Sequence, residues 1–304
     1  MELFLPIAEM SVHWLAILGM GFAIGFLSGM FGIGGGFLLT PALMFYGIPP
    51  AVAVATGTCP LTAVSVSGVL ANAKRNAVDY QLGGVLVAGG AVGSLLGVLL
   101  FGWLQRLGQI ETVIALSYVL LLGAVGGLML NESARTLRRR RADKAAPSLP
   151  GLHAWILRLP FKRQFTESHL YISVLPPAVL GLAVGLLSAV LGVGGGFLLV
   201  PAMIYFLKVP TNIAIGTSMF QILFVSAMAT IFQAATNYSV DIVLALILIL
   251  GGVAGVQYGV RSGAKLRGVQ LRFLLALLIL AVAAKLAFDL FVTPQELYSL
   301  QVRP

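Results

Sequence analysis

The chain has 304 residues, of which 59% are hydrophobic and only 10% are charged, and its mean hydropathy is +1.00. Soluble domains carry about 25% charged residues, so this composition excludes an ordinary soluble domain and predicts an integral membrane protein in a lipid bilayer. The net charge of +9 does not indicate a nucleic-acid partner, because the basic residues fall in short stretches between apolar runs. In such places they determine membrane topology.

The first apolar stretch, residues 12–46, contains a glycine-rich interruption. Residues 32–39 read GIGGGFLL, and each glycine inside a helix costs about 1 kcal/mol relative to alanine. The stretch is therefore predicted to be a helical hairpin that breaks at the glycines. Three spans, each close to the roughly 20 apolar residues that cross a bilayer, are predicted to follow it at residues 51–73, 80–104 and 110–130.

The segment 131–169 is the only long polar part of the sequence. It contains four consecutive arginines at 138–141 and three prolines, Pro147, Pro150 and Pro160. We interpret it as a basic linker on the cytoplasmic side. Within it, residues 155–161 combine apolar and basic side chains, a pattern that fits either a short helix at the membrane interface or a solvated loop.

The second half of the chain repeats the pattern of the first. Residues 192–199 read GVGGGFLL, 160 positions after the first motif. Further along, Gly57-Thr58 matches Gly216-Thr217, and Val78-Asp79 matches Val240-Asp241. Such a series of matches indicates duplication, with a first repeat at 12–130 and a second at 170–292. The second hairpin, residues 171–206, is followed by spans predicted at 212–235, 241–259 and 269–292.

The distribution of positive charge decides how the hairpins cross the membrane. A single crossing by each hairpin would place five basic residues opposite the linker: Lys208, Arg261, Lys265, Arg267 and Arg272. If each hairpin turns back, all five lie on the linker's side, as the positive-inside rule requires. We therefore predict an all-α polytopic membrane protein with two inverted-topology repeats. Each repeat is a glycine-broken, re-entrant helical hairpin followed by three transmembrane helices, and both termini lie outside.

The two breaks form the predicted substrate site. Helices that begin near Phe37 and Phe197 would direct free N–H groups, and the positive end of the helix dipole, toward the break. Two such ends near the midplane bind an anion without lysine or arginine. The motif residues assigned to the site are Gly34, Gly35, Gly36, Phe37, Gly194, Gly195, Gly196 and Phe197. The alternative is that these small residues only permit close helix packing.

Polar residues in the span after each hairpin are candidates to complete the site. They are Thr56, Thr58, Cys59, Thr217, Ser218 and Gln221. The hydroxyl groups of the threonines and the serine either donate to an oxyanion or bond to carbonyls of their own helix. The buried amide of Gln221 is open to the same two interpretations. For Cys59, packing as a small buried residue competes with a redox or nucleophilic role.

Two aspartates, Asp79 and Asp241, open the second span that follows each hairpin. At that position an aspartate caps the helix, whereas a carboxylate deeper in the membrane would suggest proton coupling. No metal or other cofactor is expected, because the single cysteine and the three histidines, which lie outside the spans, offer no ligand spacing.

With their flanking residues, the motifs GMFGIGGGFLLTPAL and VLGVGGGFLLVPAM resemble the sulfite exporter TauE/SafE family, also called the toluene sulfonate uptake permeases. The strings ATGTCP and AIGTSMF after the motifs agree with it, as do NAVDY and YSVDI at the start of the second span after each hairpin. The resemblance covers nearly the whole chain except the linker. It implies a bacterial inner-membrane carrier of small sulfur-containing anions such as sulfite, sulfoacetate or other organosulfonates. In such a membrane, the outside placement predicted from the charges puts both termini in the periplasm.

The expected function is a secondary transporter that exports a small sulfur-containing anion. Uptake instead of export is one alternative, and a permease or channel for another small anion, such as a carboxylate or thiosulfate, is another. An enzyme is disfavoured, because the spans contain no paired nucleophile and base. The sequence does not indicate an oligomeric state.

Overall fold

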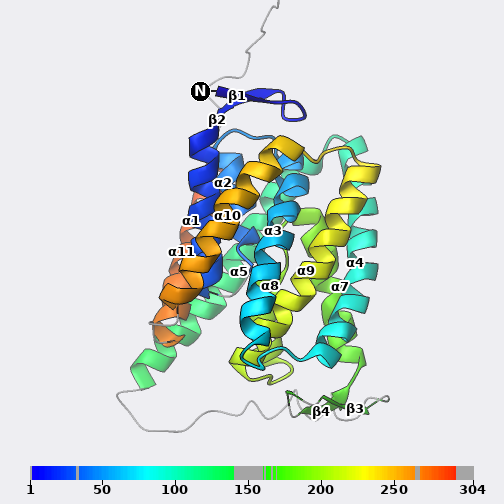
Figure 1. Ribbon diagram of the computed structural model, residues 1–304, viewed down its shortest axis with the longest axis vertical. Coiled ribbons are helices and arrows are strands. Elements are labelled where there is room, and N and C mark those ends of the chain that lie inside the picture. Colours follow the sequence, from blue (N-terminus) through cyan, green and yellow to red (C-terminus); the bar gives the residue numbers. More distant parts are fainter. Residues whose placement is uncertain are drawn as a thin grey trace, which may run out of the picture.

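The computed structural model describes residues 2–31, 34–139, 160, 162–165, 167–168, 170–263 and 268–291. Within these ranges it contains ten helices, five in each half of the chain (Figure 1). The first half has α1 (Trp14–Phe31), α2 (Gly36–Phe45), α3 (Pro50–Ala73), α4 (Tyr80–Arg106) and α5 (Ile110–Arg139). The second half has α7 (Leu175–Leu191), α8 (Gly196–Tyr205), α9 (Thr211–Thr236), α10 (Ile242–Gly263) and α11 (Gly268–Phe291).

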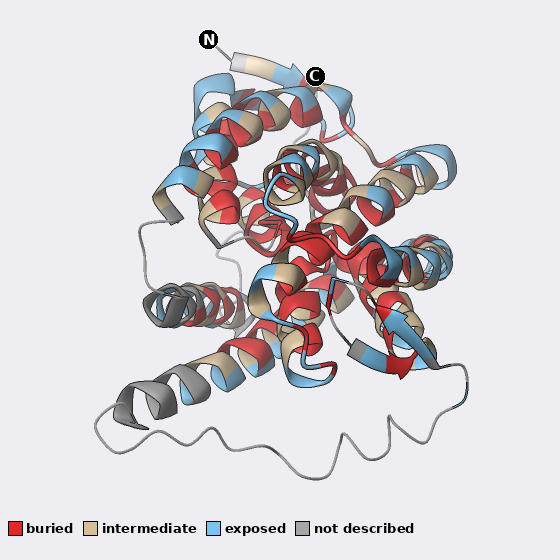
Figure 2. Cartoon of the chain, turned by 60° about the horizontal axis from the view of Figure 1, so that its bottom comes forward, coloured by how far each residue is buried: buried red, intermediate tan, exposed pale blue. Residues whose placement is uncertain are grey.

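Five of the described helices are long and apolar enough to cross a bilayer: α3, α4, α5, α9 and α10. Their outer faces expose large apolar side chains, such as Leu99 (58% exposed), Leu120 (64%) and Leu250 (66%), which suit lipid and not water. Buried residues gather along the middle of the bundle, and the exposed ones lie on its rim (Figure 2). The chain is an all-α polytopic membrane protein, as its composition predicts.

The helix bounds follow the predicted spans closely, with one difference at the end of the first half. Helix α5 continues to Arg139, whereas the pattern predicts a linker from residue 131. The first residues of that segment include Glu132, Ala134 and Arg135, which favour helix, although Glu132 and Arg135 are too polar for the membrane. Residues 155–161, for which an interfacial helix or a loop was the open choice, lie outside the described residues.

Each half begins with a two-stranded β-hairpin that the sequence pattern does not predict. Strand β1 (Glu2–Leu5) pairs antiparallel with β2 (Met10–His13), and β3 (Lys162–Phe165) pairs with β4 (Leu170–Ser173). Four residues are too few for an alternating apolar pattern to stand out. Equivalent strands begin 160 positions apart, which is also the spacing of the two glycine motifs. The two hairpins lie at opposite ends of the molecule (Figure 1).

At the β1–β2 end, Asp241 joins the two halves of the chain. It precedes α10 and caps it, because the Leu244 N–H donates to its Oδ1 (3.1 Å). The N–H of Ile7, in the turn between β1 and β2, donates to Oδ2 of the same carboxylate (3.0 Å). The N–H of Asp241 itself donates to Oγ1 of Thr56 in α3 (2.9 Å).

At the β3–β4 end, Asp79 makes the same connections with the halves exchanged. The N–H groups of Gln81 and Leu82 donate to its Oδ1 (3.1 and 2.9 Å), so it caps α4. Both the N–H and the hydroxyl of Ser168 donate to Oδ2 (3.0 and 2.6 Å). The Asp79 N–H donates to Oγ1 of Thr217 (3.0 Å). The capping role predicted for both aspartates is confirmed, and each carboxylate also holds the hairpin of the other half.

The halves pack against each other through glycine-rich helix faces. Helix α1 packs along α10, and α4 packs along α7. A Cβ on Gly25 would clash with the backbone of Gly252, and a Cβ on Gly185 would clash with that of Gly90. The α1–α10 contact therefore becomes the α4–α7 contact when the two halves are exchanged. Two further contacts, α3–α9 and α5–α11, each join a helix of one half to its equivalent in the other half. Small residues thus let backbones from the two halves come into direct contact.

Candidate functional site

Both helix breaks predicted from the glycine motifs are present. Residues 32–35 separate α1 from α2, and residues 192–195 separate α7 from α8; residues 32 and 33 lie outside the described part of the chain. The residues that precede α2 and α8 are Gly35 (φ 70°) and Gly195 (φ 74°). Because this left-handed conformation is strained for residues with a side chain, glycine allows a new helix to start in so little space.

Each break exposes the start of a helix. The Leu39 N–H donates to the carbonyl of Gly35 (3.2 Å), and the Leu199 N–H donates to that of Gly195 (2.8 Å). The first N–H groups of a helix have no carbonyl one turn earlier to bond. In α2 and α8 these groups point back toward the breaks, together with the positive end of each helix dipole.

The two breaks meet in the buried centre of the bundle. The rings of Phe37 and Phe197 lie with their centroids 5.4 Å apart, and these side chains are 1% and 2% exposed. A Cβ on Gly36 would clash with the carbonyl of Val193 in the other break. The backbones of the two motifs are therefore in contact, although the motifs are far apart in sequence.

A helix of the opposite half covers each break. A Cβ on Gly34 would lie 2.9 Å from Cδ1 of Ile222 in α9, and a Cβ on Gly194 would lie 2.7 Å from Cδ1 of Leu61 in α3. Thr56, near the start of α3, bonds Asp241 at the β1–β2 end. The chain thus leaves that end in α1 and returns to it through α2, and the breaks lie where the chain turns.

Buried polar atoms without a hydrogen-bond partner occur in the helices around the breaks. Within the described part of the chain they include the hydroxyls of Ser28, Ser65, Ser188 and Ser226 and both amide atoms of Gln221. Ser28 is 2% exposed and the other four residues are fully buried. Because a stranded buried polar atom costs about 1–3 kcal/mol, each requires an explanation.

The four serines form two pairs, and the members of each pair occupy equivalent places in the two halves. Ser28 and Ser188 precede the two breaks at the same spacing, a match visible in the duplicated sequence, whereas Ser65 and Ser226 occupy equivalent places in α3 and α9. None of them is among the candidates that we derived from the sequence. The signal that identifies them is the absence of a partner, which only the folded chain shows.

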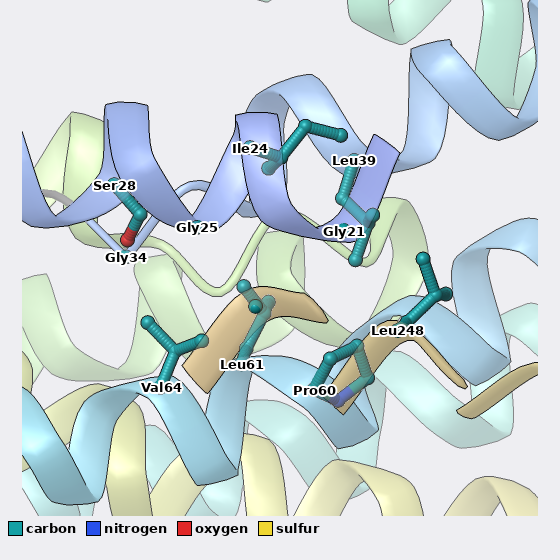
Figure 3. A pocket seen from close by; sticks show the side chains of 11 residues that line it. Gly21, Ile24, Gly25, Ser28, Gly34, Leu39, Pro60, Leu61, Val64 and Leu248 are labelled. Carbon is teal, nitrogen blue, oxygen red and sulfur yellow. The ribbon is translucent and has the colours of Figure 1, made fainter. Parts of the chain in front are cut away.

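A small cavity lies beside the first break, between α1, α2, α3 and α10 (Figure 3). Its lining includes Ser28, Gly34 and Pro60, and in Figure 3 the Ser28 hydroxyl points toward Gly34. The cavity has a volume of about 20 Å³, and roughly 10–15 Å³ is enough to hold one water. The break is therefore closed in this conformation, with room for a group the size of one water.

The predicted hydroxyl candidates all have protein partners. Thr56 and Thr217 accept the aspartate N–H groups described above. The Thr58 hydroxyl donates to the carbonyl of Ala55 (2.8 Å) and lies 2.8 Å from Oγ1 of Thr230. The Ser218 hydroxyl donates to the carbonyl of Ile215 (2.8 Å). Thr58 and Ser218 thus follow the back-bonding alternative, and Cys59 is a free, half-buried thiol.

The structure corrects the alignment of the two repeats in this region. The sequence matches suggest that Gly57-Thr58 corresponds to Gly216-Thr217, but the exchanged hydrogen bonds pair Thr56 with Thr217. Helices α3 and α9 begin directly after Pro49 and Pro210, so the offset from the first to the second repeat grows by one residue after the breaks. The short motif Gly-Thr occurs by chance at a nearby register.

Paired helix breaks that meet at the buried centre of an all-α polytopic membrane protein are the architecture of a membrane transporter. The family model described as sulfite exporter TauE/SafE matches residues 17–286. The chain belongs to this family of membrane transporters.

Individual relatives agree over most of the chain. It is 29% identical over 275 residues to the probable membrane transporter protein YjnA of Bacillus subtilis, a match that covers 90% of this chain and 99% of the relative. It is 24% identical over 287 residues to YunE of the same organism, covering 91% and 98%. A probable membrane transporter protein of Xylella fastidiosa is 30% identical over 249 residues, covering 79% and 81%. No solved structure matches the chain.

Proposed function

We propose that the protein is a secondary transporter that exports a small sulfur-containing anion, such as sulfite or an organosulfonate, across the bacterial inner membrane. The cargo binds where the two glycine breaks meet. One observation carries the proposal: two helix starts converge at a buried point, next to serine hydroxyls that have no partner among the described residues. An oxyanion is the ligand that accepts hydrogen bonds from both kinds of donor.

In this proposal the two motifs supply the primary contacts. The N–H groups of residues 36–37 and 196–197 donate to the anion from opposite sides, and Gly34, Gly35, Gly194 and Gly195 shape the approach of the backbone. Ser28 and Ser188 add hydroxyl donors, and Gln221 adds an amide. Thr58, Cys59 and Ser218 lie on α3 and α9, the helices that cover the breaks, and the hydroxyls of Thr58 and Ser218 bond to their own helix. Thr56 and Thr217 act by holding the ends of the bundle.

The arrangement of the halves supports alternating access. Equivalent β-hairpins lie at opposite ends of the molecule, and each is held by an aspartate of the other half. We infer that the halves are inverted repeats in the membrane, so that opening one end is the mirror of opening the other. The positive-inside rule then places the basic linker in the cytoplasm and both termini in the periplasm.

The proposal is tested by anion binding to the purified protein in detergent. Sulfite, sulfoacetate, thiosulfate and a carboxylate are compared by the shift that each produces in the thermal unfolding midpoint. We expect the sulfur oxyanions to stabilise the protein most. If none of the four anions shifts the midpoint, the site is not an anion site; if the carboxylate alone does so, the cargo class is wrong.

Two serine variants separate binding from folding. Ser28→Ala and Ser188→Ala remove stranded hydroxyls, so we expect the ligand-free protein to be as stable as the wild type or more stable. A hydrogen bond to a charged group contributes about 1.5–3 kcal/mol, so each variant should bind the anion at least about tenfold more weakly. Ser94→Ala is the matched control, because the Ser94 hydroxyl is buried but donates to the carbonyl of Ala91 (3.0 Å). Equal loss in the control would remove the serines from the site.

Transport in proteoliposomes distinguishes a carrier from a channel. A carrier saturates with anion concentration and exchanges labelled for unlabelled cargo, whereas a channel passes current in proportion to the gradient. Export is supported if flux from the side that carries the linker exceeds the reverse flux under matched gradients, and uptake is the function if the reverse holds.

A further inference from the structure

The exchanged contacts allow the two halves of the site to be compared residue by residue. Leu61 contacts Gly194 as Ile222 contacts Gly34, and Gly252 lies against Gly25 as Gly90 lies against Gly185. By the same correspondence, Pro60 in α3 is equivalent to Gln221 in α9, because the two helices begin one residue after Pro49 and Pro210. The apolar ring of Pro60 thus occupies the place that the amide of Gln221 occupies in the other half.

The two half-sites differ in what fills the equivalent space. In the first half, the cavity of Figure 3 lies next to Pro60, between Gly21, Val64 and Gly252. Apart from the Ser28 hydroxyl, the side chains that line it are apolar.

In the second half, the side chain of Gln221 reaches into the corresponding space. A Cβ on Gly90 would lie 3.0 Å from its Nε2 and 2.5 Å from Val225, whereas at Gly252 the nearest atom would be Cγ2 of Val64 at 3.3 Å. Gln221 is fully buried, and within the described ranges neither its Nε2 nor its Oε1 has a hydrogen-bond partner.

An amide that is buried without partners, at the place where the other half has an apolar cavity, points to a ligand with two different ends. We infer that the half-sites are not equivalent: the Gln221 amide donates to an oxygen of the anionic head, and the cavity beside Pro60 receives a short apolar substituent of the same molecule. This inference rests on the proposed transport of an anion bound between the breaks. It assigns Gln221 to recognition of the head and the first-half cavity to selection by chain length.

Binding of a series of alkanesulfonates tests the assignment, because methane-, ethane- and propanesulfonate share one head and one charge and differ only in apolar length. Gly252→Ala places a methyl group between Val64 and Gly21, where the distances from its Cβ would be 3.3 and 3.8 Å, so it partly fills the cavity with little displacement. A methylene in an apolar pocket changes affinity about tenfold or more. We expect this variant to bind the longest alkanesulfonate that the wild type accommodates with about tenfold lower affinity. Its affinity for the next shorter member should equal that of the wild type.

Gln221→Leu tests the other half-site. Because no group in the part of the chain that the structure describes bonds the amide, the replacement strands nothing there, and the ligand-free variant should unfold at or above the wild-type midpoint. We expect its affinity to fall about tenfold or more for every member of the series alike, because the anionic head is common to all of them. Gly84→Ala is the control for both variants, since a Cβ there meets nothing within 4 Å; we expect wild-type affinities throughout.

The outcomes separate the two levels of the proposal. If the wild type binds neither these sulfonates nor sulfite, thiosulfate or a carboxylate, the anion site and the half-site assignment both fall. If the wild type binds the series but Gly252→Ala weakens all members equally, or Gln221→Leu binds them as the wild type does, only the assignment of unequal half-sites is overturned.

Discussion

The most demanding test of the fold is the carboxylate of Asp79, which both caps α4 and holds the β3–β4 hairpin. We consider Asp79→Asn, which keeps the size of the side chain and remains a good helix cap. In the wild type, Oδ1 accepts from Gln81 and Leu82, and Oδ2 accepts from the N–H and the hydroxyl of Ser168. An amide has only one acceptor oxygen, so if it stays with the helix the NH₂ group faces Ser168.

The size of the effect follows from what Ser168 can still bond. Its hydroxyl can turn to accept from the amide, but its N–H is left facing a donor, and Ser168 is only 3% exposed. A stranded N–H costs about 1–3 kcal/mol, and a charge-assisted bond replaced by a neutral one loses about 1 kcal/mol more. We therefore expect Asp79→Asn to destabilise the protein by about 2–4 kcal/mol.

Asp241→Asn provides the matched comparison within the same molecule. Its Oδ2 accepts from the Ile7 N–H, and in the described part of the chain no hydroxyl adds to that bond. The loss is then about 1–3 kcal/mol from one donor. Thermal and denaturant unfolding of both variants in the same detergent measure the difference. Equal destabilisation, or a larger effect at Asp241, would refute the view that the two hairpins are held with unequal strength.

Three further outcomes are expected. Gly185→Ala should lose about 1–3 kcal/mol by overpacking against the backbone of Gly90, and the exposed control Gly84→Ala should lose nothing; similar unfolding midpoints would contradict backbone contact between α4 and α7. Tyr118→Phe should lower the free energy of unfolding by about 1–3 kcal/mol, because the Tyr118 hydroxyl donates to the carbonyl of Leu191 (2.6 Å) at the end of α7. An unchanged midpoint of unfolding by urea would show that this carbonyl finds another donor. A reporter fused at the C-terminus should be active in the periplasm, and activity in the cytoplasm would reject the returning path of both hairpins.

Much of the fold is visible in the sequence, because hydropathy and glycine content act locally. The spans predicted at 51–73 and 80–104 correspond to α3 (Pro50–Ala73) and α4 (Tyr80–Arg106). The breaks were predictable for the same reason, since three consecutive glycines disfavour a helix whatever surrounds them. The β-hairpins were not, because strands of four residues become stable only through the partner strand and the aspartate that holds the turn.

The candidate site likewise has residues that the sequence predicts and residues whose role only the fold shows. The glycines of the breaks were predicted from their composition, and the pairing of Phe37 with Phe197 agrees with two motifs that meet. The roles of Thr56 and Thr217 were not predictable, because their partners are the N–H groups of Asp241 and Asp79 from the opposite half. A threonine in a span has the same sequence pattern whether it bonds its own helix, a ligand or another helix.

The sequence alone determined that this chain lies in a membrane, that it is duplicated and where its helices break, because each of these depends on the transfer energy and backbone preference of neighbouring residues. The tertiary structure alone decided which polar groups are satisfied and which are left without partners. The bond between Ile7 and Asp241 joins residues 234 positions apart, and the isolation of the Gln221 amide is a property of everything packed around it. Such facts arise only when the two halves close on each other, since burial removes water as the alternative partner.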